Sequence, residues 1–179
     1  MDFLAVVGPE VAEFVEGLDP FAPALFGVAW AGQDVSPNWL DTGREYTEGW
    51  HHQQQIREAV GAPLLTRREW LFPVLDVSMR ALPHSYRDVE AAAGQAVAFR
   101  VTGDAGGAWS LRREAGEWRL FTGEVESPAC RVEADADTAW RVFFKAIVPA
   151  EAAARVRIDG DARLGRVFLG TLAVMARHS

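Results

Sequence analysis

The hydrophobic period changes once along this chain, near residue 94, and this change restricts the possible folds more than any other feature. Before it, apolar residues recur every three or four positions, as on one face of an amphipathic helix. After it, Val97, Phe99 and Val101 lie two residues apart, as in a half-buried strand. The sequence therefore predicts an α+β protein: a helical region over residues 1–93, then an antiparallel-sheet domain with helices over residues 94–179.

Glycine-rich turns divide the second region. Gly103 to Gly107 and Ala115-Gly116 predict the two turns of an antiparallel meander. A fourth strand contains Cys130, and a fifth ends at Gly160-Asp161. We expect Asp137 to cap the helix after the fourth strand and Asp161 to cap a last helix that reaches Met175.

The first region carries several helix start and stop signals. Ser36 and Pro37 predict an N-cap and first residue, and Gly61 predicts the end of a helix that reaches Val60. Thr66 with Glu69 three residues later is a capping-box pattern. The other helices predicted here cover about 9–17, 67–82 and 84–93, with a kink or restart at Pro73.

Glu48 and His52 are the first candidate site. They lie four residues apart in the longest predicted helix of this region, which places their Cβ atoms about 5–6 Å apart on one face. That face continues through Glu45 and Ile56 and has the pattern of a buried stripe. A carboxylate and an imidazole so placed can share a divalent metal, and they can equally hydrogen-bond to each other in a core. His51 points about 100° away and is a poor ligand for the same ion. Glu45, one turn earlier, and a second copy of the chain are the candidates for a third ligand.

Composition excludes several classes of function. The net charge is −7, and no run of three basic residues occurs, although 17 of the 18 basic residues are Arg. We therefore expect no nucleic-acid partner. Because the only cysteine is Cys130, no internal disulfide can form, and we expect a buried, inert thiol. The sequence has neither a signal peptide nor an apolar run of the ~18 residues that span a membrane. We expect a cytoplasmic protein that does not bind a membrane.

Two sets of motifs, taken in order, resemble one family. The first set is Thr-Glu-x-x-x-His-x-x-x-Ile-Arg at 47–57, Ala-Pro at 62–63 and Leu-Pro-x-x-Tyr-Arg at 82–87. The second is the strand and helix order of 95–177, with Val-Thr-Gly at 101–103, Gly-x-Trp at 107–109 and Ile-x-Gly-Asp at 158–161. In this order they look like the mycothiol-dependent maleylpyruvate isomerase family, whose members join a DinB-like metal-binding helical bundle to a sterol-carrier-protein-2-like domain.

The resemblance implies an activity and a site. It implies a metal- and thiol-dependent isomerase or transferase that uses a divalent metal such as zinc, and mycothiol, on a small-molecule substrate. Glu48 and His52 match the family's second pair of metal ligands, with Gln55 where an Asp is common. The family's early histidine has no counterpart, because residues 1–44 contain no His, and the first part of the bundle is expected to be missing. Arg163 and Arg166 are the candidates for clamping an anionic substrate.

Two other functions remain open. The resemblance also implies an apolar groove between sheet and helices, which would make the chain a non-catalytic small-molecule or lipid binding module. The candidate groove residues are Phe99, Phe143, Phe144, Phe168 and Leu172. The third reading is a protein with an interaction or structural role only. Because half a bundle leaves an apolar face uncovered, we also expect a homodimer.

Overall fold

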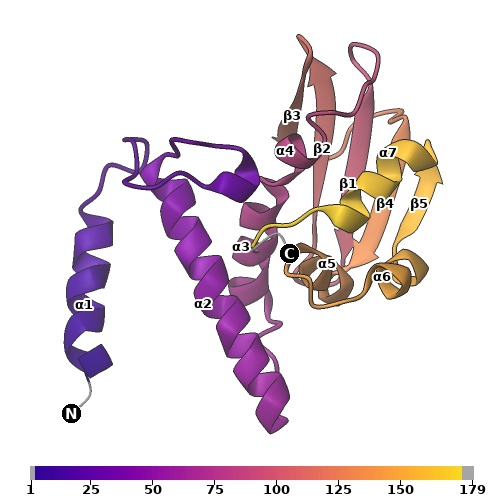
Figure 1. The fold of residues 1–179 in the computed structure, drawn as a ribbon. Helices are drawn as coiled ribbons and strands as arrows, with labels where there is room; N and C mark the ends of the chain where they lie inside the picture. Colours follow the sequence, from indigo (N-terminus) through magenta and orange to yellow (C-terminus); the bar gives the residue numbers. More distant parts are fainter. Residues whose placement is uncertain (1–2, 175–179) are drawn as a thin grey trace.

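The computed structural model describes residues 3–174 of the chain, with side chains from residue 7 onward. It confirms the α+β class, with helices first and a five-stranded sheet after them (Figure 1). In chain order the elements are α1 (Phe3–Glu16), η1 (Ala29–Ala31), α2 (Asn38–Val60), α3 (Arg68–Met79), α4 (Leu82–Ser85), β1 (Ala96–Thr102), β2 (Gly107–Glu114), β3 (Glu117–Thr122), β4 (Cys130–Asp135), α5 (Ala136–Phe143), α6 (Pro149–Arg155), β5 (Arg157–Gly160), α7 (Ala162–Arg166) and η2 (Val167–Gly170); η marks a 3-10 turn.

The sheet has the strand order β3-β2-β1-β4-β5. Strands β1, β2 and β3 form the predicted antiparallel meander, and β4 pairs antiparallel with β5. The pair β1–β4 is parallel, with Phe99 opposite Val132. The chain leaves β3 at one edge of the sheet and returns beside β1, so the sheet is mostly rather than wholly antiparallel.

Alternation along the strands gives the sheet two different faces. Phe99, Trp109 and Val132 lie in one row of the register and are buried on the face that the helices cover (Figure 1). Arg100 and Arg112 point to the other face and are exposed. One face packed and one solvated is the usual arrangement of such sheets, and it explains the period of two in the sequence.

The helical region and the sheet share one hydrophobic core. Helix α3 packs against both α2 and α5. On α2, the Trp50 ring meets Trp140 of α5 edge to face at 5.4 Å. On the sheet, the Trp109 indole nitrogen donates a 2.7 Å hydrogen bond to Asp76 Oδ1 of α3. No helix within residues 3–174 combines the length and the apolar character needed to cross a membrane.

Two of the predicted helix starts in the first region are wrong. Helix α2 has Pro37 at its N-cap position, and the hydroxyl of Ser36 instead accepts a 2.8 Å hydrogen bond from the Val28 N–H. Ser36 is buried, so its hydroxyl serves the preceding loop rather than the helix. Helix α3 has Arg67 at its N-cap without a side-chain cap, so the Thr66 capping box does not form. The predicted end of α2 is confirmed, because Gly61 has a left-handed φ of 67°.

Of the two helix caps predicted in the second region, one is wrong and one is confirmed. Asp135, not Asp137, caps α5, and its carboxylate accepts a 2.7 Å hydrogen bond from the Thr138 N–H. Asp161 caps α7 as predicted, accepting from the backbone N–H groups of Arg163 and Leu164. Aspartate is a favourable N-cap residue at either position, so the sequence pattern alone does not choose between Asp135 and Asp137.

Three helices differ in length from the prediction. Helix α1 already begins at Phe3 and contains Pro9 within it. Helix α4 is a single turn that ends at Ser85, and beyond it the Val89 carbonyl accepts a hydrogen bond from the Trp118 indole. The last α-helix, α7, ends at Arg166, and the 3-10 turn η2 follows it directly. The predicted end at Met175 lies outside the described residues.

Candidate functional site

Helix α2 turns a different face to the core than the sequence pattern indicates. The buried residues of its second half are Thr47, Trp50, His51 and Gln54, whereas His52 is exposed. The predicted burial of the Glu45–Ile56 stripe is therefore wrong. The face is set by its neighbours, since the rings of α5 lie on the side of Trp50 and His51.

His52 makes a hydrogen bond within its own helix. Its Nδ1 lies 2.9 Å from Gln55 Oε1. When the amide oxygen accepts from Nδ1–H, Nε2 is left with its lone pair, which is how a metal-binding histidine is oriented by its neighbour. Glu48, one turn earlier, is half-buried and has interactions of its own.

The donor set around this pair is smaller than a zinc site requires. Within residues 3–174, no three His, Cys, Asp or Glu side chains are gathered so that they could hold a metal ion. Protein zinc sites take three or four protein ligands, and the described part of the chain offers Glu48 and His52. Within the described residues of one chain, Glu48 and His52 are therefore too few ligands for zinc.

His51, and not His52, is buried in the hydrophobic core. It is 8% exposed, and its ring lies 4.6 Å from Phe144 and 6.4 Å from Trp140, centroid to centroid. Burial lowers the pKa of His51 below its ordinary value, because the charged ring would lose its hydration. Sequence reasoning missed this residue, which stands next to His52 and has no periodic signal of its own.

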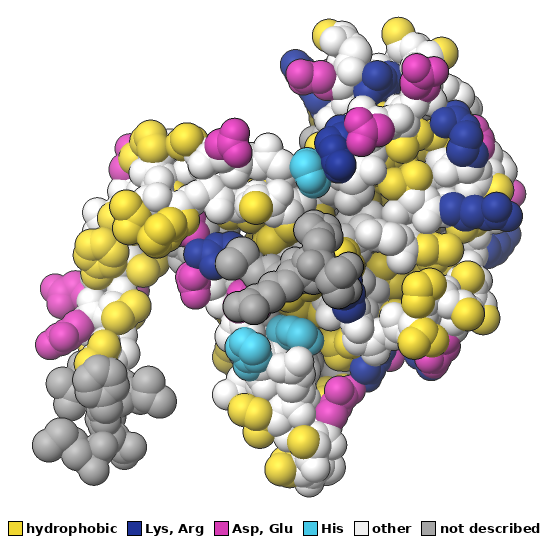
Figure 2. Space-filling model, in the orientation of Figure 1, with side chains coloured by type: hydrophobic (Ala, Val, Ile, Leu, Met, Phe, Trp, Pro, Cys, Tyr) yellow, Lys and Arg dark blue, Asp and Glu magenta, His cyan; other side chains and the backbone are white. Residues whose placement is uncertain are grey.

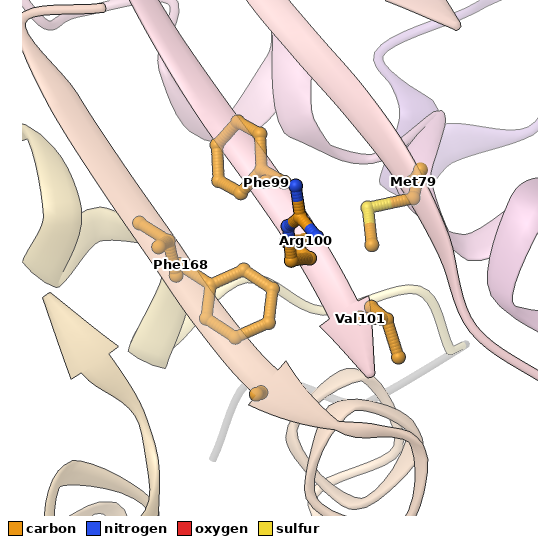
Figure 3. Close-up of a pocket in the computed structure, with 7 residues that line it drawn as sticks. Met79, Phe99, Arg100, Val101 and Phe168 are labelled. Carbon is orange, nitrogen blue, oxygen red and sulfur yellow. The ribbon is translucent and has the colours of Figure 1, made fainter. Parts of the chain in front are cut away.

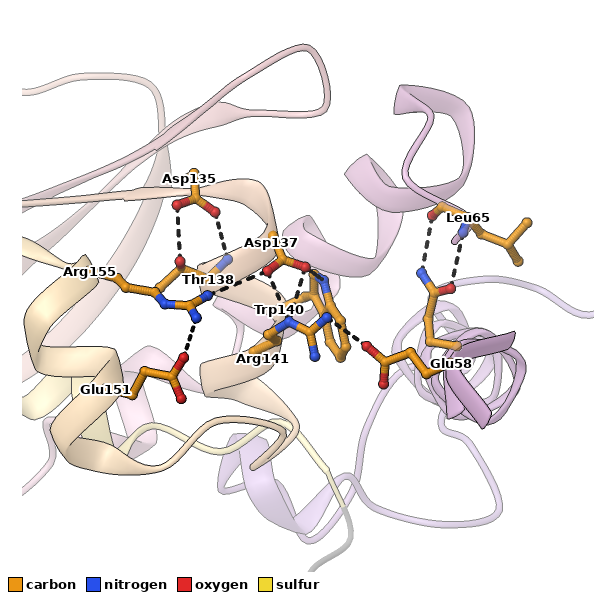
Figure 4. A network of polar contacts seen from close by, with 10 residues as sticks. Glu58, Leu65, Asp135, Asp137, Thr138, Trp140, Arg141, Glu151 and Arg155 are labelled. Atoms are coloured by element: carbon orange, nitrogen blue, oxygen red, sulfur yellow. Dashed lines mark hydrogen bonds and ion pairs between the residues drawn. The ribbon is translucent and has the colours of Figure 1, made fainter. Parts of the chain in front are cut away.

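The buried amide of Gln54 is satisfied by the backbone of one residue. Its Nε2 donates to the Leu65 carbonyl at 3.3 Å, and its Oε1 accepts from the Leu65 N–H at 3.0 Å (Figure 4). The Trp50 indole donates to the same carbonyl at 3.1 Å. These contacts fix the loop after α2 and satisfy both polar atoms of the Gln54 side chain.

A chain of ion pairs joins α2 to α5 at the molecular surface (Figure 4). Arg141 contacts both oxygens of Asp137 at 2.9–3.0 Å and Glu58 Oε1 at 2.6 Å. Asp137, predicted as a helix cap, also lies 3.8 Å from Arg155. Because each acid is paired and partly exposed, the network positions the two helices and supplies no free acid or base.

The two predicted substrate-clamping arginines lie on α7. Arg163 donates to the Glu90 carbonyl at 3.0 Å and lies 3.6 Å from Asp161. Arg166 is exposed. Neither arginine lines the small apolar space between the sheet and the helices. A role for them in clamping a substrate stays a prediction.

A small apolar space lies between the packed face of the sheet and the helices (Figure 3). It measures about 160 Å³ when the gaps between atoms and the adjoining open solvent are included, and no part of it is wide enough for a water molecule. The residues around it come from α3, β1, β4 and η2: Met79, Phe99, Arg100, Val101, Val132, Ala134 and Phe168. Most of this lining is hydrocarbon or thioether. Arg100 adjoins the space from β1, while its side chain points to the exposed face of the sheet and is ion-paired with Glu124.

The predicted groove residues divide between this space and its surroundings. Phe99 and Phe168 line it, and Phe143 packs edge to face on Phe168 at 5.6 Å. Phe144 lies on the His51 side of α5, and Leu172 is half-buried. Met79 was missed, because its position on α3 fits a core residue equally well.

Turn η2 closes the space with few hydrogen bonds. The Thr171 N–H donates to the Phe168 carbonyl at 3.0 Å, and the Thr171 hydroxyl to the Val167 carbonyl at 3.1 Å. The Ala173 N–H donates to the Phe143 carbonyl at 3.0 Å. A single 3-10 turn has fewer regular backbone hydrogen bonds than the strands and the α-helix that supply the rest of the lining.

Cys130 is buried as predicted, at 1% exposure. Burial raises the pKa of its thiol to about 11, so the thiol stays protonated at neutral pH. A protonated, enclosed thiol is a poor nucleophile and a poor metal ligand, which agrees with the expectation of an inert side chain.

Comparisons with known proteins give matches at the level of structure only. No model of a protein family matches the chain, and no curated protein matches it. Among solved structures, a ubiquinone synthesis protein described as UbiJ-SCP2 matches 51% of this chain and 76% of its own, with 16% identity and a TM-score of 0.35. A sterol carrier protein 2 like 2 from Aedes aegypti matches 53% and 93%, with 12% identity and a TM-score of 0.41. A sterol carrier protein domain 2 of Helicoverpa armigera matches 56% and 77%, with 15% identity and a TM-score of 0.34.

Proposed function

We propose that this protein is a non-catalytic binding module for small apolar molecules, lipids included, which enter between the sheet and η2. The observation that carries the proposal is the apolar space lined by Met79, Phe99 and Phe168 (Figure 3). A pocket for such a ligand is lined mainly by hydrophobic and aromatic side chains, as this space is.

Entry of a ligand requires the space to widen. The lining offers two means of widening it, the flexible thioether of Met79 and the short turn that carries Phe168. Displacing Phe168 costs its packing on Phe143 and Phe99, whose rings lie at 5.6 and 6.0 Å. An apolar ligand offsets that cost by burying its own surface at about 25 cal/mol per Å².

Binding of a pyrene-labelled fatty acid, followed by fluorescence, tests the proposal, and native mass spectrometry of the purified protein tests for a retained lipid. Ala134→Met fills the space and should weaken binding at least tenfold. Phe168→Leu enlarges it and should bind at least as well as the parent. Ala108→Met, on the uncovered face of the sheet, is the matched control and should bind like the parent.

Thermal unfolding establishes that each variant is folded before its affinity is compared with that of the parent. Absence of binding by the folded parent contradicts the proposal. So does equal binding by the parent and folded Ala134→Met, because it places the ligand elsewhere.

The competing candidate is the metal- and mycothiol-dependent isomerase or transferase that the sequence resemblance implies. Glu48 and His52 stay its predicted ligands, and Arg163 and Arg166 its predicted clamp. Metal analysis of protein purified without a tag separates the two candidates. Stoichiometric zinc that disappears in His52→Ala and persists in His84→Ala favours the enzyme, and fatty-acid binding by metal-free protein favours the binding module.

A further inference from the structure

Helix α1 stands apart from the rest of the molecule (Figures 1 and 2). On it, Val11 is 53% exposed and Phe14 is 67% exposed. A helix of 14 residues is marginal in water without tertiary packing, and Gly8 and Pro9 weaken this one further. We name α1 and the loop that follows, residues 3–35, the arm.

Two exposed apolar residues of α1 lie on one side. Val11 and Phe14 are three residues apart and so share a face. Glu13 and Glu16 project from the opposite half of the helix, and Glu10 lies at the edge of the face, one turn before Phe14. A partner that covers Val11 and Phe14 leaves Glu13 and Glu16 in water and meets Glu10 only at the edge of the contact, where its carboxylate stays solvated. The helix has the pattern of one that packs, although Val11 and Phe14 are exposed in the single chain.

The base of the arm is fixed to the start of α2. The Asn38 side chain donates to the Asp19 carbonyl at 2.9 Å, and the Trp39 N–H donates to the Pro20 carbonyl at 3.0 Å. Pro23 and Pro37 form an isolated bridge beside them. These contacts hold α1 away from the α2 of its own chain (Figure 1).

Helix α2 carries a matching uncovered face on the side away from the core. Ile56 is 57% exposed and Val60 is 71% exposed. Gly49 lies seven residues before Ile56, and a Cβ added there would have nothing within 4 Å. A glycine at this place lets another helix approach closely, and the two apolar side chains lie in line with it.

We infer that two copies of this chain exchange arms, so that α1 of each lies along the Gly49–Ile56–Val60 face of its partner's α2. Each chain carries both the Val11–Phe14 face of α1 and the Gly49–Ile56–Val60 face of α2, and these two faces do not meet within the chain. In a two-fold symmetric dimer, the α1 face of each copy meets the α2 face of the other. The inference is independent of the proposed ligand site.

The exposed phenylalanines of the arm supply about half of the area that a dimer interface needs. Three phenylalanines of the arm, Phe14, Phe21 and Phe26, are 62–81% exposed. At about 150–250 Å² for a buried aromatic side chain they represent roughly 300–500 Å² per copy. A standard interface buries about 800 Å² per partner, and the other exposed apolar residues of the arm and of α2 add to the phenylalanines.

Light scattering on the full chain from 1 to 50 μM tests the exchange. The parent should have twice the mass of one chain. Phe14→Glu should give a monomer, because it places a charge in the contact. Gly49→Gln should also give a monomer, and it leaves the fold of the single chain intact because the added side chain has free space. Ala12→Gln, outside the Val11–Phe14 face, should remain a dimer.

Cross-linking tests which surfaces meet. Phe14→Cys and Ile56→Cys proteins, mixed and oxidised, should form a disulfide-linked pair, whereas Ala12→Cys mixed with Ile56→Cys should not. A monomeric parent at 50 μM overturns the inference. So does a dimer that survives both Phe14→Glu and Gly49→Gln, since its contact then lies elsewhere.

Discussion

The imidazole of His51 lies 4.6 Å from the ring of Phe144, so a titratable group of α2 forms part of the contact with α5. The adjacent Trp50 meets Trp140 in the same contact. This packing joins the helical region to the sheet domain through rings from both. It also makes the contact sensitive to the charge on one of them.

Acidification should destabilise the protein through His51. Burial lowers the pKa of His51 and of His84 from the ordinary 6.5, so the unfolded chain binds protons at a pH where the folded chain does not. The contribution of these two neutral histidines to the free energy of unfolding should therefore be complete above pH 6.5. The free energy of unfolding should fall as the pH drops below that value. Urea unfolding at pH 7.5, 6.5 and 5.5 measures the slope, which His51→Leu should flatten.

The control for this prediction is His52→Gln, which changes the exposed neighbour on the same helix. It should change the slope less than His51→Leu does, because burial is the largest cause of the lowered pKa of His51 and the charge of His52 is a smaller one. A slope that is equal in His51→Leu and the parent would show that His51 does not contribute to the pH dependence.

Removing Asp76 should destabilise the contact between sheet and α3. Asp76→Ala leaves the indole N–H of the buried Trp109 without its 2.7 Å acceptor, which costs about 1–3 kcal/mol. Chemical denaturation measures the loss. Asp88→Ala removes an 85% exposed carboxylate and should change stability little, and equal losses in the two variants would contradict the role given to the hydrogen bond.

A methyl group at Gly165 should be poorly tolerated. Its Cβ would lie 2.3 Å from Ile158 Cγ2 and 2.9 Å from the Cys130 sulfur, in a well-packed region. Gly165→Ala should therefore lower the free energy of unfolding by about 1–3 kcal/mol. Gly170→Ala is the matched control, because a Cβ added at Gly170 has nothing within 4 Å. If the Gly165→Ala and Gly170→Ala proteins are equally stable, the close packing around Gly165 is refuted.

The two tyrosines should respond differently to loss of the hydroxyl. Tyr86 is fully buried and donates a 2.7 Å hydrogen bond to the Leu164 carbonyl of α7. Tyr46 is 37% exposed and donates to the Trp70 carbonyl at 2.9 Å. Tyr86→Phe should cost about 0.5–1.5 kcal/mol and Tyr46→Phe less, because water replaces the lost partner only at the exposed site. Thermal unfolding of the two variants side by side measures the difference.

The candidate site was predictable only in part. Phe99 and Phe168 were foreseen as groove residues, because large apolar side chains at inward positions are visible in the sequence. Met79 was not, since its contact with them depends on how α3 crosses the sheet. Glu48 and His52 were correctly placed on one helix, but the choice of His51 for the core depends on Phe144, nearly a hundred residues away.

The sequence by itself determined what depends on neighbours along the chain. The period of two fixed the inward faces of the strands, the glycine turns separated them, and Gly61 ended α2 because only a left-handed residue closes a helix in that way. Each of these follows from the geometry of a few consecutive residues.

Only the tertiary structure decided what depends on distant partners. It placed β4 parallel beside β1, moved the cap of α5 from Asp137 to Asp135, gave the Ser36 hydroxyl to the preceding loop and turned the Trp50–His51 face of α2 inward. In each case several local solutions have similar free energies. The contacts made when the helices close over the sheet select one of them.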